Sequence, residues 1–213
     1  MKLALAYDTE TTGLPDFKAP SHAPHQPHIV QLAARLIDLE TRKSIASMDV
    51  IIKPNGWTIP DEVSKIHGIT TEHAMDVGIP ELMAVEMLIE LWAGRSLIGH
   101  NESFDRRICR IAIKRLIEPF SIEHVSLSDK WQAAMSECTC LLATPLCQIP
   151  PTAKMKAAGF NKFKSANLTE AHLHFTGQPL KDAHSAMADV DGCLVVYWAI
   201  KDRQDPAYAA RAT

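Results

Sequence analysis

Two acidic side chains near the start of the chain, Asp8 and Glu10, stand two residues apart at the end of an apolar run. In a strand, residues i and i+2 project from the same face, so the two carboxylates would lie side by side. Adjacent carboxylates repel each other unless a cation neutralises them, and oxygen ligands of this kind suit magnesium or manganese. The spacing therefore indicates a divalent metal site, with two solvated acids at a strand end as the simpler alternative.

Further groups of the same chemistry follow later in the chain. Asp105 comes after the short apolar run 96–99, and His184 precedes Asp189 where a long C-terminal helix is expected to begin. Strand ends of a mostly parallel sheet meet in one crevice, so these groups can converge with the first pair of acids. Because His184 and Asp189 are five residues apart, about 140° around a helix, both can serve one site only if His184 lies on the lead-in to the helix.

Alternating strands and helices are predicted between these groups, since apolar runs with strand character alternate with segments of helical periodicity. The expected strands are residues 3–7, 29–38, 48–53, 96–99 and 125–127. The expected helices are residues 79–92, a helix from Asp105, residues 130–142 with Asp129 as N-cap, residues 168–175 and residues 183–200. This order indicates an α/β protein whose second and third strands form a hairpin beside the first.

Composition argues against several classes of protein. The chain has 213 residues and a formal net charge of -3, so its overall field would not attract a nucleic acid. Its apolar runs are shorter than the roughly 20 residues of a membrane span, and its first residues predict no signal peptide. We therefore expect a cytoplasmic protein with no membrane association, formed by a single domain over residues 1–200 and a C-terminal tail over 201–213.

Local charge differs from this net charge in the segment around residue 160. Lys154, Lys156, Lys162 and Lys164 fall in a stretch that contains proline and glycine and is expected to be irregular. We expect these lysines to contact a phosphate backbone, and a solvated loop is the alternative.

Three stretches of the sequence resemble a known set of motifs. Asp-Thr-Glu-Thr-Thr-Gly at 8–13, His-Asn-Glu-Ser-Phe-Asp at 100–105 and His-Ser-Ala-Met-Ala-Asp at 184–189 are similar to the three exonuclease motifs of the DEDDh family, the DnaQ-like 3'-5' exonucleases. Within this family the chain looks like the histidine branch and resembles proofreading exonuclease domains. The resemblance covers roughly residues 3–200.

This resemblance implies a ribonuclease H-like α/β fold, with a mixed five-stranded sheet that has one antiparallel strand and is flanked by helices. It implies that two Mg²⁺ or Mn²⁺ ions are held by four carboxylates and that His184 is the general base. The implied metal ligands are Asp8, Glu10, Asp105 and Asp189. Two metal ions suit the reaction, because a phosphodiester is anionic and its attacking and leaving oxygens both need stabilisation.

The resemblance also implies contacts to the end of the substrate. Thr11, with the backbone around Thr12 and Gly13, would receive the terminal 3'-hydroxyl. Leu14 and Phe104 would pack against the last bases, although Phe104 is equally well explained as a core aromatic. For the adjacent His100 and Asn101, which we include among the substrate-binding candidates, the alternative is that they fix the turn that aims Asp105.

We therefore expect a metal-dependent 3'-5' exonuclease that releases nucleoside 5'-monophosphates from single-stranded 3' ends, with DNA favoured over RNA. The alternatives are an enzyme that trims RNA or oligoribonucleotides and a non-catalytic nucleic-acid clamp. The sequence contains no polymerase region, so a role in proofreading would require a separate polymerase partner.

Overall fold

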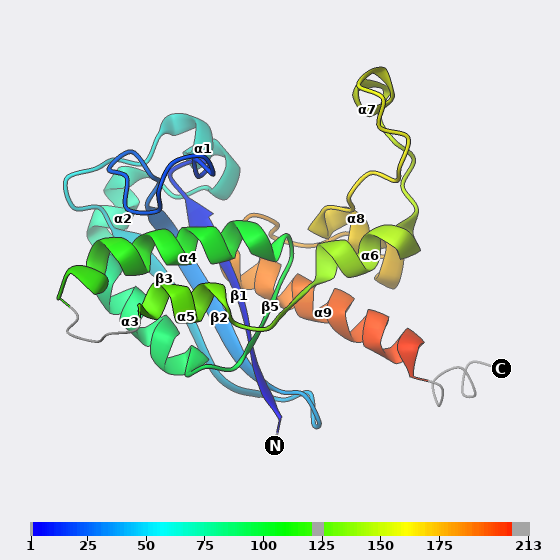
Figure 1. Cartoon of the computed structure of the whole chain (residues 1–213), viewed down its shortest axis with the longest axis horizontal. Helices are drawn as coiled ribbons and strands as arrows, with labels where there is room; N and C mark the ends of the chain where they lie inside the picture. Colours follow the sequence, from blue (N-terminus) through cyan, green and yellow to red (C-terminus); the bar gives the residue numbers. More distant parts are fainter. Residues whose placement is uncertain (1, 121–125, 206–213) are drawn as a thin grey trace.

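A mixed β-sheet with helices on both faces forms the body of the protein (Figure 1). The computed structural model describes residues 2–120 and 126–205. Its strands are β1 (Leu3–Thr11), β2 (Ile29–Asp38), β3 (Ser44–Lys53), β4 (Ile79–Pro80), β5 (Ser96–Gly99) and β6 (Ser136–Cys138). Its helices are α1 (Asp61–His67), α2 (Thr71–Val77), α3 (Glu81–Trp92), α4 (Glu102–Leu116), a 3₁₀ turn (Glu118–Phe120), α5 (Leu127–Gln132), α6 (Thr139–Cys147), α7 (Ala153–Ala157), α8 (Leu168–Thr176) and α9 (Ala186–Gln204).

The strands lie in the order β4-β3-β2-β1-β5-β6. Strand β2 is antiparallel to both β1 and β3, whereas β5 runs parallel to β1 and β6 runs parallel to β5. The predicted mixed five-stranded sheet with one antiparallel strand is therefore confirmed. The two-residue β4 pairs with the end of β3 and adds a short sixth strand at that edge.

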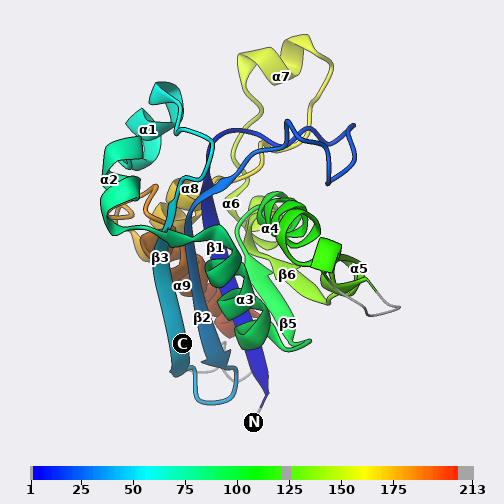
Figure 2. The ribbon, with the colours of Figure 1, turned by 90° about the vertical axis from the view of Figure 1, so that its left-hand side faces the viewer.

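Strand β1 separates two hydrophobic cores, because successive side chains of a strand point to opposite faces. Leu5 and Tyr7 pack into the core that includes residues of α3, α4 and α5. Ala4 and Ala6 face the core formed with α9. Figure 2 shows α3 and α4 on one side of the sheet and α9 on the other. Both faces of β1 are thus covered, and its carboxyl end lies between the elements that carry the remaining candidate site residues.

The helix predicted over residues 130–142 is wrong. Helix α5 ends at Gln132, residues 136–138 form β6, and α6 begins at Thr139. Residues 136–138 are extended because they pair with β5, a long-range contact that outweighs local helical preference. Asp129 is not the N-cap of α5; the Ser126 hydroxyl accepts the capping hydrogen bond. Of the strand predicted over 125–127, residue 125 lies outside the described residues and Leu127 begins α5.

Other boundaries differ by a few residues. Helix α3 starts at Glu81, because Ile79 and Pro80 pair with β3. Helix α4 starts at Glu102, one turn before the predicted position. Helix α9 continues to Gln204, so the segment predicted as a tail from residue 201 begins as helix, and its residues 206–213 lie outside the described part of the chain. Among the described helices, none is long and apolar enough to cross a membrane.

Candidate active site

The carboxyl end of β1 carries the first two candidate ligands. Asp8 and Glu10 pair in register with β2, and a bulge follows between Glu10 and Thr11. Even-numbered residues of β1 face α9, as Ala4 and Ala6 do, so the strand alternation places Asp8 and Glu10 on that same face. The two carboxylates thus lie on the face of the sheet that α9 covers.

Asp105 reaches the site from α4 on the opposite face. It lies in the first turn of α4 and is 3% exposed. Its Oδ1 accepts two hydrogen bonds from Thr9, one from the backbone N–H at 3.0 Å and one from the hydroxyl at 2.7 Å. Thr9, which lies between the two acids of β1, therefore holds the Asp105 carboxylate directly against that strand.

His184 and Asp189 come from the start of α9. His184 has a positive φ of 70° and lies on the lead-in, two residues before the helix begins at Ala186. Its backbone N–H donates a hydrogen bond to Asp189 Oδ2 at 3.2 Å. Potential ligand atoms of His184, Asp189 and Glu10 all lie within 4.8 Å of one another. The structure thus gives His184 the lead-in position that its spacing from Asp189 requires.

The four carboxyl groups share an environment that disfavours negative charge. Burial is the largest cause in each case. It raises the pKa of Asp8 well above its usual value, with a further contribution from the charges of the neighbouring acids. Burial, with the charges of Asp189 and Asp105, raises the pKa of Glu10 to about 8. It also raises the pKa of Asp105 to about 7 and that of Asp189 above its usual value.

This set of donors fits divalent cations. Oδ1 of Asp189 is buried and has no hydrogen-bond partner in the part of the chain that the structure describes. Carboxylate oxygens are the ligands that magnesium and manganese prefer, and a cation would neutralise the negative charges that burial disfavours. The arrangement suits metal binding, and the assignment of each carboxylate as a ligand stays a prediction.

The structure adds two residues for which the sequence reasoning proposed no role. Thr9 was seen only as part of the first motif, although it binds Asp105. His67, at the end of α1, lies near His184, and burial together with that imidazole lowers the pKa of His67. Its Nδ1 accepts the N–H of Ile69 at 3.1 Å, and its Nε2 is buried without a partner among the described residues. The sequence signal available for His67 was the stretch Ile66-His67-Gly68-Ile69-Thr70, which also resembles a segment of the DEDDh exonucleases.

The loop after β1 contains the candidates for the 3'-terminal nucleotide. The Thr11 hydroxyl donates to the Gly13 carbonyl at 2.8 Å, so Thr11 is engaged in shaping the turn. Thr12 donates its N–H to the His28 carbonyl at 3.0 Å and accepts the His28 N–H on its hydroxyl at 2.9 Å. Leu14 is 85% exposed. The loop is thus fixed at its start and presents an apolar side chain to the solvent.

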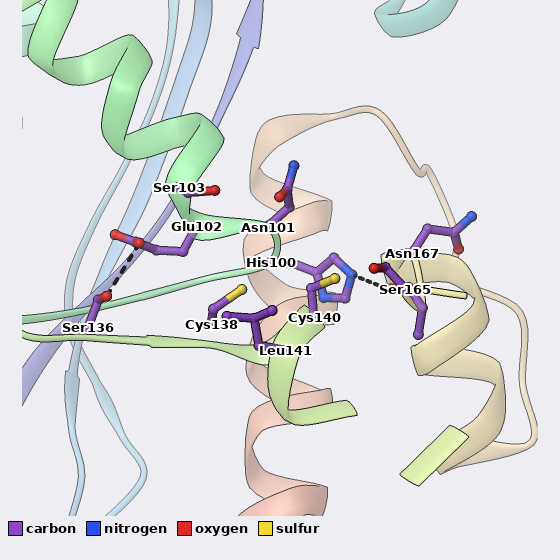
Figure 3. Close-up of a pocket in the computed structure, with 11 residues that line it drawn as sticks. His100, Asn101, Glu102, Ser103, Ser136, Cys138, Cys140, Leu141, Ser165 and Asn167 are labelled. Carbon is purple, nitrogen blue, oxygen red and sulfur yellow. Dashed lines mark hydrogen bonds between the residues drawn. The ribbon is translucent and has the colours of Figure 1, made fainter. Parts of the chain in front are cut away.

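His100 and Asn101 lie in the wall of a cavity of about 500 Å³ that is lined by neither Asp105 nor the acids of β1 (Figure 3). The two ring nitrogens of His100 contact the Thr139 hydroxyl at 2.9 Å and the Ala166 carbonyl at 3.0 Å. Asn101 adopts a left-handed conformation at the N-cap of α4. Phe104 packs against the larger core. These contacts favour the alternatives stated for the three residues: a turn that aims Asp105, and a core aromatic.

Comparison with known proteins agrees with this architecture. Residues 5–197 match the family model RNase_T, described as an exonuclease family. No curated protein matches the chain.

Several solved structures share the fold. Exonuclease I of E. coli in complex with a dT13 oligonucleotide has a TM-score of 0.67 and 19% identity over 99% of this chain and 43% of that chain. A zinc-bound complex of the same enzyme with single-stranded DNA has a TM-score of 0.64 and 18% identity, over 99% of this chain and 42% of that chain. Exonuclease I from Methylocaldum szegediense has a TM-score of 0.67 and 21% identity, over 98% of this chain and 42% of that chain. The chain spans less than half of the length of these proteins, and the likeness shows the ribonuclease H-like α/β fold.

Proposed function

The chain belongs to the RNase_T exonuclease family, and from this premise we propose that it is a metal-dependent 3'-5' exonuclease of single-stranded nucleic acid. It releases nucleoside 5'-monophosphates, with DNA as the favoured substrate and RNA or oligoribonucleotides as the alternative. The observation that carries this proposal is the convergence of four carboxylates and one histidine from β1, α4 and α9 at the carboxyl end of β1.

The chemistry follows from the groups that converge there. Two Mg²⁺ or Mn²⁺ ions held by the four carboxylates would supply neutralising charge and a water of lowered pKa. The exposed imidazole of His184 accepts the proton of the attacking water, since histidine changes charge near neutral pH. The water oxygen forms a bond to phosphorus while the bond between phosphorus and the 3'-oxygen of the preceding nucleotide breaks. This releases a nucleoside 5'-monophosphate, and the 3'-oxygen takes a proton from solvent to become the new 3'-hydroxyl of the shortened strand. The hydrogen bond from the His184 backbone N–H to Asp189 holds the backbone that carries this imidazole beside the carboxylates.

The loop after β1 would hold the last nucleotide. The Thr11 hydroxyl and the backbone at residues 12–13 would receive the 3'-hydroxyl. The exposed Leu14 supplies an apolar contact for the terminal base, a contact that does not depend on base identity. Phe104 contributes less, because it packs against the core.

A single-stranded DNA substrate is supported by the solved relatives that hold such oligonucleotides. Because those proteins are more than twice as long, their substrates come to this chain as a proposal. A separate polymerase partner, a single domain over residues 1–200 and a cytoplasmic location stay predictions from the sequence.

The test is a digestion time course with DNA and RNA of matched sequence, labelled at either the 3' or the 5' end, in Mg²⁺, Mn²⁺ or EDTA. We expect immediate release of labelled mononucleotide from the 3' label and a descending ladder from the 5' label. EDTA should abolish both the release of mononucleotide and the ladder. The initial rates show whether DNA or RNA is the preferred substrate.

Two variants connect the activity to the site. Asp8→Asn should abolish cleavage, and His184→Gln should lower kcat by about 10²–10⁴-fold because it removes the general base. Circular dichroism checks that both variants fold. Internal cleavage or release from the 5' end would refute the proposal. Binding without cleavage in any metal would favour the nucleic-acid clamp.

A further inference from the structure

A projecting segment between α6 and α8 stands out from the body of the protein. We call residues 150–163 the basic arm; it includes α7 (Figure 1). In both ribbon views, α7 lies at the end of the molecule toward which β1 points, the end that also holds the loop after β1 (Figure 2). The basic arm therefore lies at the same end of the sheet as the carboxylates.

The root of the basic arm is tied to the active-site framework. The Lys164 N–H donates to the Ile149 carbonyl at 2.9 Å, which closes the base of the loop. Ala166 is fully buried; its N–H donates to the Thr144 hydroxyl at 3.2 Å, and its carbonyl contacts His100 Nε2 at 3.0 Å. His100 immediately precedes the turn into α4, which carries Asp105. The arm thus starts from a fixed point that contacts the segment leading into α4.

The charge of the arm is opposite to that of the whole chain. No Asp or Glu occurs between Glu137 and Glu170, although the net charge of the protein is -3. Lys154, Lys156 and Lys162 are exposed, and none of them forms an ion pair with a described residue. Lys164, by contrast, is paired with Glu170 at 2.5 Å. Three uncompensated cations therefore lie on the part that projects into solvent.

Two aromatic side chains accompany these cations. Phe160 is 64% exposed and Phe163 is 46% exposed. The turn that carries Phe160 has a defined shape, because its N–H donates to the Met155 carbonyl at 2.9 Å. Exposed aromatics interleaved with lysines are the combination that binds single strands, since bases stack on aromatic faces while cations contact phosphates.

We propose that the basic arm binds the single-stranded part of the substrate that lies upstream of the 3'-terminal nucleotide. Phe160 and Phe163 stack on bases, and Lys154, Lys156 and Lys162 contact phosphates. The inference rests on the proposed function, because it assumes that the 3' end lies among the carboxylates. Stacking on phenylalanine does not read the base, so the arm adds affinity without sequence preference.

Charge favours this occupant over a second copy of the same arm. Two arms that each carry three unpaired lysines would repel each other, whereas a polyanion releases bound counterions when it meets them. Association between copies of the chain is thus an outcome that the test must be able to detect.

The first experiment measures binding by anisotropy of a fluorescent dT20 strand, with Ca²⁺ in place of Mg²⁺ to stop turnover. The double variant Phe160→Ala/Phe163→Ala should bind about tenfold more weakly or worse. The triple variant Lys154→Gln/Lys156→Gln/Lys162→Gln should lower the slope of log affinity against log salt by about 2, at roughly 0.7 for each phosphate contact. The matched control is Lys2→Gln/Lys43→Gln, which removes exposed lysines outside the arm and should leave the slope unchanged.

The second experiment separates the arm from the chemistry. Hydrolysis of the p-nitrophenyl ester of thymidine 5'-monophosphate needs the carboxylates. This substrate is a single nucleotide, so it has no upstream strand for the arm to bind. Both arm variants should hydrolyse it at the wild-type rate while their KM for dT20 rises. If wild-type protein hydrolyses neither the ester nor DNA, the proposed function fails, and the binding results still decide the role of the arm.

The inference is overturned if the phenylalanine variant binds dT20 as tightly as wild type, or if the lysine variant keeps the full salt slope. It is also overturned if sedimentation shows an oligomer that the arm variants dissociate without any loss of affinity for dT20.

Discussion

At the scale of single residues, Thr9 has a role that differs from those of its two acidic neighbours. Its side chain points to the face of α4, whereas Asp8 and Glu10 share the face of α9. It gives Asp105 two hydrogen bonds, which lower the pKa of that carboxyl against the larger effect of burial. A residue between two candidate ligands thus orients a third one.

Thr9→Val removes the hydroxyl and keeps the shape of the side chain. We expect activity or metal affinity to fall by about 10–100-fold, because groups that orient metal ligands usually contribute that much. The measurement is the Mn²⁺ concentration for half-maximal activity together with kcat. Thr9→Ser keeps the donor and should stay close to wild type; an equal loss in both variants would show that the hydroxyl has no such role.

At the scale of elements, Glu102 anchors the first turn of α4. Its carboxylate accepts hydrogen bonds from Tyr7 Oη at 3.0 Å, Arg106 Nε at 2.8 Å and Ser136 Oγ at 3.3 Å. These donors belong to β1, α4 and β6. The helix start that carries Asp105 is therefore fixed to two strands of the sheet, and the anchor is itself 4% exposed.

Glu102→Ala should destabilise the protein by about 3–5 kcal/mol, because it leaves the Arg106 side chain, which is only 11% exposed, without its carboxylate partner. Urea unfolding measures the change. The control is Asp129→Ala, which removes the partner of Arg110 on the same helix. Since the Asp129 side chain is 62% exposed, that change should cost at most about 1 kcal/mol. Similar losses in the two variants would contradict the anchoring role.

At the scale of the whole molecule, the carboxylate cluster connects stability to pH and metal. The pKa values of Glu10, about 8, and Asp105, about 7, are raised above those of the unfolded chain. The stability that their bound protons contribute is therefore fully present below the pKa values of the unfolded chain, about 4, and is lost as the pH rises from there to about 7 to 8. A divalent ion replaces those protons, so it should stabilise the protein most where the carboxyls have ionised.

We expect the increase in Tm caused by saturating Mg²⁺, relative to EDTA, to grow between pH 6.5 and 8.5. A change of 1 kcal/mol corresponds to about 2–4 °C in a domain of this size. Differential scanning calorimetry with and without Mg²⁺ measures it. The comparison with and without Mg²⁺ at each pH is needed because Cys138 changes stability with pH in the opposite direction. A hydrogen bond from the Cys140 thiol lowers the pKa of Cys138 to about 5, so its contribution to stability increases as the pH rises.

Glu10→Gln serves as the control for this experiment, since the amide does not titrate. Its Mg²⁺-dependent increase in Tm should be smaller and should vary less with pH. An increase in wild-type Tm that is the same at both pH values would mean that the cluster does not exchange protons for metal.

Local sequence was sufficient where a side-chain role depends on neighbours along the chain. Strand alternation placed Asp8 and Glu10 on one face, and helix geometry required His184 to precede the helix of Asp189, as its position on the lead-in shows. The same local reasoning failed for residues 136–138. Those residues are extended only because β5 offers them a partner, and a pairing partner distant in sequence leaves no local signal.

The sequence by itself thus determined the residue types of the site, the alternation of strands and helices, and the family to which three short motifs point. Only the tertiary structure decided that Thr9 holds Asp105, that both ring nitrogens of His100 are already engaged, and that the lysines of residues 150–163 share an exposed arm with Phe160 and Phe163. The physical reason is that alternation and spacing act between near neighbours. Burial, hydrogen-bond partners and exposure depend on which distant segments the fold brings together.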